Sequence, residues 1–170
     1  DQFFLLSLNP ESHFAFGWEG NDIHESQQLQ GVALNAADHE LYVADSALQH
    51  ICVYDFDGRY RRSITTRIQV DNPLIGFRSL FKPADLADLV LEATASPTGL
   101  FFDAASSVLL VADSENDRIL LVRPEGSGTL VRQFGSRGSG NGQLKGPTGL
   151  AMHPVTREIF VCDSQNDRIQ

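Results

Sequence analysis

Short runs of apolar residues, separated by polar turns, recur along the chain and predict β-strands. Three four-residue runs stand in similar contexts, at residues 41–44, 109–112 and 159–162. Each run is too short for a helix and is bounded by turn-forming residues, as expected of a strand that is buried on both faces. A polar turn and a second apolar run follow, at residues 51–54 and 119–122. The pattern predicts antiparallel strands joined by tight turns.

The apolar runs belong to a sequence unit that occurs three times. Each run ends at an aspartate, and the aspartates are Asp45, Asp113 and Asp163, which gives intervals of 68 (113 − 45) and 50 (163 − 113) residues. The same two intervals separate three glycines, Gly31, Gly99 and Gly149. Fifty residues accommodate four short strands with their turns, and the longer first interval indicates an insertion.

A four-stranded sheet of this kind has two apolar faces, and both must be covered. Radial stacking of such sheets covers both faces and leaves only short edges, so the sequence predicts an all-β fold of the β-propeller type. A β-solenoid is the alternative, which the hairpin turns inside each unit disfavour. The units are anchored at residues 31–64, 99–134 and 149–170, and residues 1–16 form the end of a preceding unit.

The repeated unit resembles the NHL repeat, which forms a propeller blade. The matching elements are the Gly-Leu opening, the Val-Ala-Asp or Val-Cys-Asp strand end, the Asn-Asp-Arg-Ile run and the Gly-rich linker at residues 134–149. The resemblance covers residues 1–170 outside one insertion. It implies about three blades of four antiparallel strands, from a propeller of six. We expect the remaining blades in the rest of a longer chain, with a homodimer as the alternative.

Polar turns follow the buried strands and hold the residues that the repeat preserves. An aspartate at a strand end can accept hydrogen bonds from the amides of the next turn, and an arginine can pair with a nearby carboxylate. We therefore expect a structural role for the residues Asp45, Asp113, Asn116, Arg118, Asp163, Asn166 and Arg168. Calcium binding by residues 113–117 is the alternative, although the glycine and spacing of an EF-hand loop are missing. The first unit lacks the Asn and Arg.

Residues 65–97 form an insertion between two units and differ from the rest of the chain. A proline at its centre and apolar residues at helical spacing predict a short amphipathic helix from residue 83. The insertion either folds back on the propeller or binds a protein partner, as loops on rigid scaffolds often do. The candidate partner-binding residues, in segment 71–94, are Leu74, Ile75, Phe77, Leu80, Phe81, Leu86, Leu89 and Val90.

Composition and charge narrow the function classes. The composition is typical of a soluble globular protein, and no apolar run is long enough to cross a membrane. A net charge of −9 disfavours binding to nucleic acid, so an RNA-binding NHL domain ranks as a second alternative. Two cysteines cannot form a disulfide framework, and with no recognisable signal peptide they favour an intracellular protein.

The sequence contains no recognisable catalytic motif. The five histidines are scattered, and no nucleophile motif or zinc-ligand pair is present. The NHL family includes lyases that use zinc and calcium, so a metal-dependent propeller enzyme, with its site in the central channel, is the first alternative. No motif in this chain matches the metal site of those lyases. We expect a non-catalytic scaffold without a cofactor that mediates protein–protein interaction.

Overall fold

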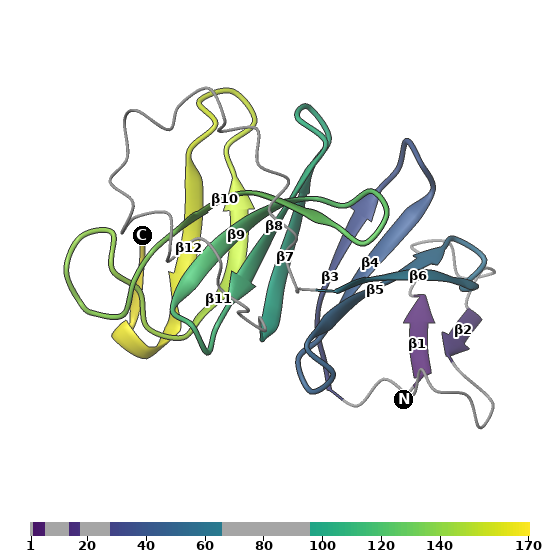
Figure 1. The fold of residues 1–170 in the computed structure, drawn as a ribbon, viewed down its shortest axis with the longest axis horizontal. Coiled ribbons are helices and arrows are strands. Elements are labelled where there is room, and N and C mark those ends of the chain that lie inside the picture. Colours follow the sequence, from purple (N-terminus) through teal and green to yellow (C-terminus); the bar gives the residue numbers. More distant parts are fainter. Residues whose placement is uncertain (1, 6–13, 18–27, 66–95) are drawn as a thin grey trace, which may run out of the picture.

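The computed structural model describes residues 2–5, 14–17, 28–65 and 96–170 (Figure 1). Nearly all the regular structure in these segments is β-strand, and the one helical turn among them is the 3-10 helix η2 (Ser164–Asn166). Strands β1 (Gln2–Leu5) and β2 (Phe14–Gly17) pair as an antiparallel two-stranded sheet. The other strands form three blades that follow one another along the chain.

Each blade is an antiparallel meander in chain order. The first blade consists of β3 (Leu29–Asn35), β4 (Glu40–Asp45), β5 (His50–Asp55) and β6 (Tyr60–Thr65). The second blade consists of β7 (Pro97–Asp103), β8 (Val108–Asp113), β9 (Arg118–Arg123) and β10 (Thr129–Phe134). The third blade consists of β11 (Pro147–Met152), β12 (Ile159–Asp163) and β13 (Arg168–Ile169).

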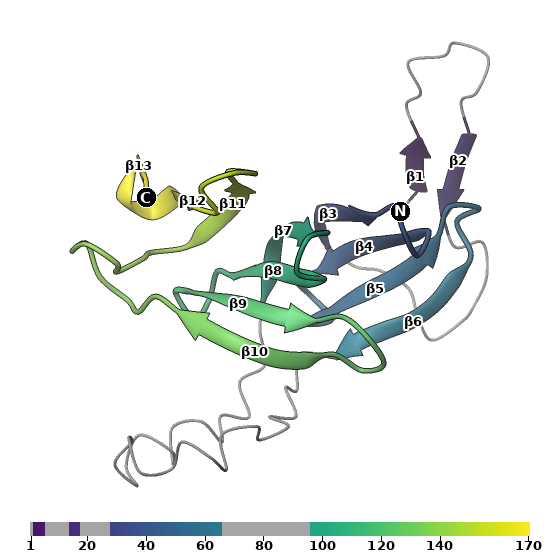
Figure 2. The ribbon, with the colours of Figure 1, turned by 90° about the horizontal axis from the view of Figure 1, so that it is seen from above.

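The blades stack through their faces, with the first strands of successive blades next to one another. Figure 2 shows β3, β7 and β11 in a row along one side of the molecule, and β6 and β10 along the opposite side. Apolar side chains of the first two blades share one core, which includes Tyr42, Val53 and Leu109. A second core joins the second and third blades through Ile119 and Val161. Every residue of β8 is buried, because that strand is covered on both faces.

The repeated glycines lie where the first strands of neighbouring blades meet. A Cβ atom on Gly31 would overlap the backbone carbonyl oxygen of Thr98, and one on Gly99 would overlap the carbonyl oxygen of Thr148. Only glycine allows this approach of two main chains. The spacing of Gly31 and Gly99 in the sequence therefore reflects the contact between blades.

The described strands confirm the all-β antiparallel architecture expected from the apolar runs, with four strands in each of the first two blades and three in the third. The predicted helix from residue 83 lies outside the described residues, as does most of the 65–97 insertion. Within the part of the chain that the structure describes, no helix has the length and apolar character needed to span a membrane.

Candidate functional site

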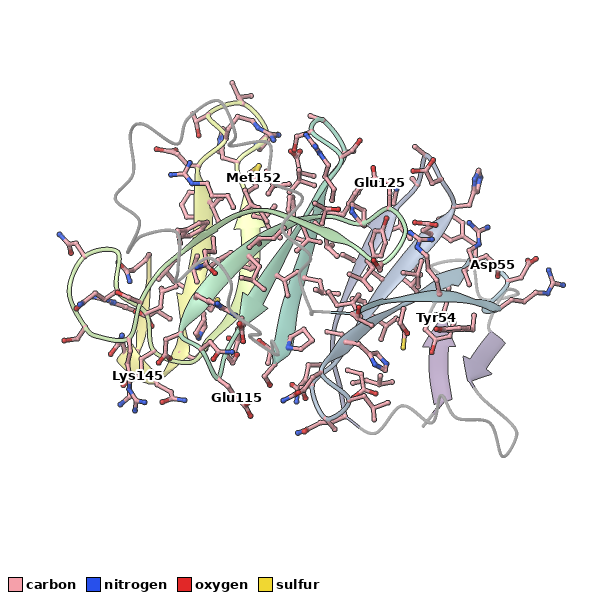
Figure 3. All side chains as sticks on the ribbon, in the orientation of Figure 1. Tyr54, Asp55, Glu115, Glu125, Lys145 and Met152 are labelled. Carbon is pink, nitrogen blue, oxygen red and sulfur yellow. The ribbon has the colours of Figure 1, made fainter. Side chains whose placement is uncertain are left out.

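Polar side chains are concentrated at the two ends of the blades. In Figure 3, Glu115 and Lys145 lie at one end of the sheets, together with the turns that join second and third strands. Glu125 and Met152 lie at the opposite end, together with the remaining hairpin turns. We call the first the linker end, because the segment between β10 and β11 runs there.

At the linker end of the second blade, a buried aspartate holds the turn together. Asp113 is fully buried at the end of β8. Its carboxylate accepts hydrogen bonds from Asn116 Nδ2 at 2.8 Å, from Arg118 Nε at 2.7 Å and from the backbone N–H of Ser96 at 3.0 Å. The side chain of Arg118 is only 9% exposed, and its Nη1 donates to Gln133 Oε1. The charge is thus compensated inside the blade.

The third blade repeats this arrangement around Asp163. Arg168 Nε and Asn166 Nδ2 donate to its carboxylate at 2.7 and 2.9 Å, and the backbone N–H of Lys145 donates at 2.6 Å. Burial raises the pKa of Asp163, but these hydrogen bonds, with one from Gln170, outweigh burial and lower that pKa to about 2. The carboxylate is therefore ionised at neutral pH.

The first blade keeps the aspartate but uses different partners. Asp45 is fully buried, and its Oδ1 accepts hydrogen bonds from the backbone N–H groups of Ala47 and Leu48 at 3.1 and 3.0 Å. Asp45 Oδ1 lies 3.4 Å from the backbone nitrogen of Gln28, which matches the place of Ser96 and Lys145 in the other blades. In the first blade, the backbone amides of the turn thus donate to the aspartate in place of the Asn and Arg side chains, which this blade lacks.

At the opposite end, an ion pair connects the second and third blades. Arg157, in the turn between β11 and β12, donates from Nη1 to Asp103 Oδ1 at 2.7 Å and also pairs with the second carboxylate oxygen. The Arg157 guanidinium, with a hydrogen bond from the Ser106 hydroxyl, holds the pKa of Asp103 well below its usual range. This bidentate pair fixes the third blade against the second.

A matching network connects the first and second blades. Arg62 pairs with Glu40, with its Nη2 at 2.9 Å from Oε2, and the same Nη2 donates to the carbonyl of Pro124 at 3.0 Å. The hydrogen bond from Arg62 lowers the pKa of Glu40. Burial raises the pKa of Tyr42 to about 12, and its hydroxyl donates to Glu40 while accepting from Asn35. The phenol is therefore a neutral hydrogen-bonding group.

A pair of hydroxyl groups at the linker end joins the second blade to the third. The side-chain oxygens of Thr98 and Ser114 lie 2.7 Å apart, and both groups donate to the carbonyl of Pro147 at the start of β11. The third blade has the same pair, since Thr148 and Ser164 lie 2.5 Å apart. Sequence reasoning missed these groups. The repeated Pro-Thr-Gly and Asp-Ser segments were the available signal.

The predicted site residues fall into two groups. Asp113, Arg118, Asp163 and Arg168 come together in pairs within their turns, as described above. The candidate partner-binding residues, from Leu74 to Val90, lie outside the described residues. Among the residues that the structure describes, no three His, Cys, Asp or Glu side chains are grouped as a metal site.

Comparison with known proteins identifies the architecture. No protein-family model matches the chain, and no curated protein matches it in sequence. A streptogramin B lyase structure matches 88% of this chain with 38% of its own, at a TM-score of 0.54 and 14% identity. A chain of a nidogen/laminin complex matches 91% of this chain with 46% of its own, at a TM-score of 0.55 and 16% identity.

These two matches show the fold alone, because the identities are low. Both structures are propeller-type proteins, and the chain is accordingly a β-propeller segment. It spans less than half the length of either protein. One is a lyase and the other comes from a complex between two proteins, so the likeness does not distinguish a catalytic function from a binding function.

Proposed function

We propose that this chain is part of an NHL-type β-propeller that serves as a non-catalytic scaffold for a protein partner. The proposal rests on the hydrogen bonds of the repeated aspartates. Asp113 and Asp163 are fully buried, and each accepts hydrogen bonds from an Asn, an Arg and a backbone amide of its own blade. A carboxylate engaged in this way organises a turn, so the motif recurs for a structural reason.

The assignment to the NHL type rests on the sequence motifs and on where they lie. The Asn-Asp-Arg-Ile run occupies the turn and the start of the third strand in the second and third blades. In both blades its Asn and Arg bind the aspartate that ends the second strand. Motif and geometry therefore agree in two of the three repeats.

The 65–97 insertion is the segment that we expect to contact the partner. It joins β6 to β7, which belong to neighbouring blades, and the corresponding linker between β10 and β11 is much shorter. The framework aspartates recur in all three blades and give no specificity. A segment that occurs once, and is rich in apolar residues such as Phe77 and Leu86, is better suited to recognise a particular protein.

Removal of residues 71–94 tests the proposal. The proteins retained by the wild-type chain from an extract of its own cells are compared with those retained by the deletion variant, by quantitative mass spectrometry. We expect at least one stoichiometric partner to be lost. The proposal fails if the variant folds, as judged by circular dichroism, and retains every partner.

Two further measurements sharpen this test. A variant with Leu86, Leu89 and Val90 changed to Ser keeps the length of the insertion, and we expect it to lose the same partner. Metal analysis of the purified protein addresses the enzymatic alternative. One zinc ion per chain would overturn the non-catalytic proposal and favour a metal-dependent propeller enzyme.

A further inference from the structure

Asn141, in the linker between β10 and β11, differs from the other asparagines that the structure describes. Asn35, Asn116 and Asn166 each donate from Nδ2 to a carboxylate, at 2.8, 2.8 and 2.9 Å. Asn141 is exposed, and no hydrogen bond joins its side chain to any described residue. The side-chain amide of Asn141 is therefore free to rotate and is accessible to water.

The residue that follows each asparagine also sets Asn141 apart. Of the four, Asn141 alone is followed by a glycine, whereas Ala36, Asp117 and Asp167 follow the others. Gly142 is exposed, and a Cβ atom built on it would meet nothing within 4 Å. Because glycine has no side chain, its backbone nitrogen is the least hindered that a protein can offer. An electrophilic side-chain carbonyl and an unhindered nitrogen thus lie next to each other in the linker.

Asn141 and Gly142 are the two central residues of a tight turn. The backbone N–H of Gln143 donates to the carbonyl of Gly140 at 3.1 Å, and Gly142 has a φ of 75°, which together indicate a type II turn. In that turn type, ψ of the second residue is about 120°, which directs the nitrogen of the third residue away from the side chain of the second. The Gly142 nitrogen must therefore reorient before it can reach the Asn141 side chain.

Gln170 holds the Gly142 nitrogen in the turn orientation. Its Oε1 accepts the Gly142 N–H at 3.0 Å. The main chain of Gln170 exchanges two hydrogen bonds with Val161 in β12, at 2.7 and 3.0 Å, and its Nε2 donates to Asp163 at 3.1 Å. The side chain that restrains Gly142 is therefore anchored to the framework of the third blade.

We propose that Asn141 is a site of spontaneous deamidation through a cyclic imide with Gly142, and that Gln170 limits the rate by holding the Gly142 amide. The Gly142 nitrogen bonds to Cγ of Asn141 and loses its proton, while the Cγ–Nδ2 bond breaks and Nδ2 leaves as ammonia. Water then opens the ring at Cγ, which gives aspartate, or at the main-chain carbonyl carbon of Asn141, which gives isoaspartate. The first step is intramolecular, because the reacting groups belong to adjacent residues.

The products change the turn that Arg168 binds. Arg168 Nη2 donates to the carbonyls of Gly140 and Gln143, which flank the Asn141–Gly142 pair, at 2.8 Å each. Isoaspartate adds one carbon atom to the main chain between these two carbonyls, and both products add a negative charge. The lengthened turn is expected to lose one of its two contacts with Arg168 Nη2.

Mass spectrometry of the incubated 170-residue chain tests the first part of the proposal. Trypsin cleaves after Arg137 and Lys145 and releases residues 138–145, a peptide with one asparagine. After incubation at physiological pH and temperature, we expect Asn141 to convert before the three hydrogen-bonded asparagines, and to give isoaspartate together with aspartate. Conversion of the other three at the same rate, or aspartate as the only product, would overturn the proposal.

Two variants test the roles of Gly142 and Gln170. Gly142→Ala places a methyl group next to the attacking nitrogen and is expected to slow the conversion of Asn141 strongly. Gln170→Ala releases the Gly142 amide and is expected to speed the conversion about 5-fold, the effect of one neutral hydrogen bond. Gln165→Ala, in the exposed turn after β12, is the matched control and should leave the rate unchanged. An unchanged rate in Gly142→Ala contradicts the imide route, and an unchanged rate in Gln170→Ala contradicts the restraint. Circular dichroism verifies that each variant folds.

A third measurement tests the effect on the turn. Asn141→Asp has the added charge with a main chain of normal length, so its comparison with the isoaspartate form isolates the lengthening. We expect the Gln143 amide hydrogen, which closes the turn, to exchange with solvent faster in the isoaspartate form. Equal exchange in the two forms would show that the turn is not altered. The chain without residues 71–94 is expected to deamidate at the wild-type rate, which separates this inference from the proposed function.

Discussion

The second and third blades have the same sequence unit but different surroundings. Arg118 and Arg168 both donate from Nε to the aspartate of their turn at 2.7 Å. Arg118 is 9% exposed, whereas Arg168 is 28% exposed and donates to the linker carbonyls of Ser139, Gly140 and Gln143. The comparison shows that the Asp–Arg pair belongs to the repeat itself, because both blades have it. The burial of that pair depends on the neighbouring segments, because it differs between the two blades.

Substitution of Arg118 and Arg168 is expected to give the largest difference in stability between the two blades. Arg118→Met leaves the fully buried Asp113 without its cation and should lower the free energy of unfolding by about 3–5 kcal/mol. Arg168→Met should cost less, about 1–3 kcal/mol, because water can approach the more open third blade. Urea denaturation of both variants measures the difference.

The matched control for this prediction removes the charge as well. Asp113→Asn combined with Arg118→Met leaves no uncompensated carboxylate in the blade, so the double variant should be more stable than Arg118→Met alone. Equal losses of stability for Arg118→Met and Arg168→Met would contradict the idea that burial distinguishes the two blades.

A second difference concerns the glycines of the first strands. Gly99→Ala forces a methyl group into the main chain at Thr148 and should destabilise the protein by about 1–3 kcal/mol. Gly149→Ala meets only the Cys162 side chain, at 3.0 Å, and should cost less than about 1 kcal/mol in the single chain. Thermal unfolding at low protein concentration measures both. An equal or larger loss for Gly149→Ala would contradict the idea that the close main-chain contact distinguishes Gly99 from Gly149.

The sequence was sufficient for the architecture because its signals are local and repeated. The run at residues 109–112 predicted β8 because four apolar residues between turns leave little choice of structure. The equal intervals between glycines and between aspartates predicted the repetition of the blade. The first signal depends on neighbours within a few residues, the second is visible because the same local pattern recurs, and the structure places the strands and the repeated residues as expected.

The contacts between blades could not be obtained in this way. Arg157 and Asp103 are 54 residues apart, and Ser114 and Pro147 are 33 apart. Nothing in the local pattern says which arginine meets which carboxylate, because the pairing depends on how one sheet lies against the next. The loss of Asn and Arg from the first blade was visible, but the use of the Ala47 and Leu48 amides in their place required the structure.

A third prediction concerns acid stability and the open blade. The pKa of Asp163 is lowered to about 2 in the folded state, from about 3.9 in an unfolded chain. Its ionised form therefore stabilises the fold fully above about pH 4, and this contribution is lost as the pH falls toward 2. Asp163→Asn should be less stable at neutral pH and should lose stability less steeply between pH 4 and 2. Urea midpoints across this range, with Asp57→Asn as an exposed control, measure the slope.

The smallest effect is expected at a pair of equivalent turn residues. Ser107 and Arg157 are 50 positions apart, and both have a positive φ, of 52° and 66°. Glycine adopts this conformation without strain, so Ser107→Gly should raise the free energy of unfolding by about 0.5 kcal/mol, after the entropy of the unfolded glycine is counted. Arg157→Gly relieves the same strain but removes the ion pair with Asp103, and should therefore lower stability. Opposite signs in thermal unfolding would show that the third blade keeps a strained residue because its side chain holds the second blade, whereas the second blade has no such need.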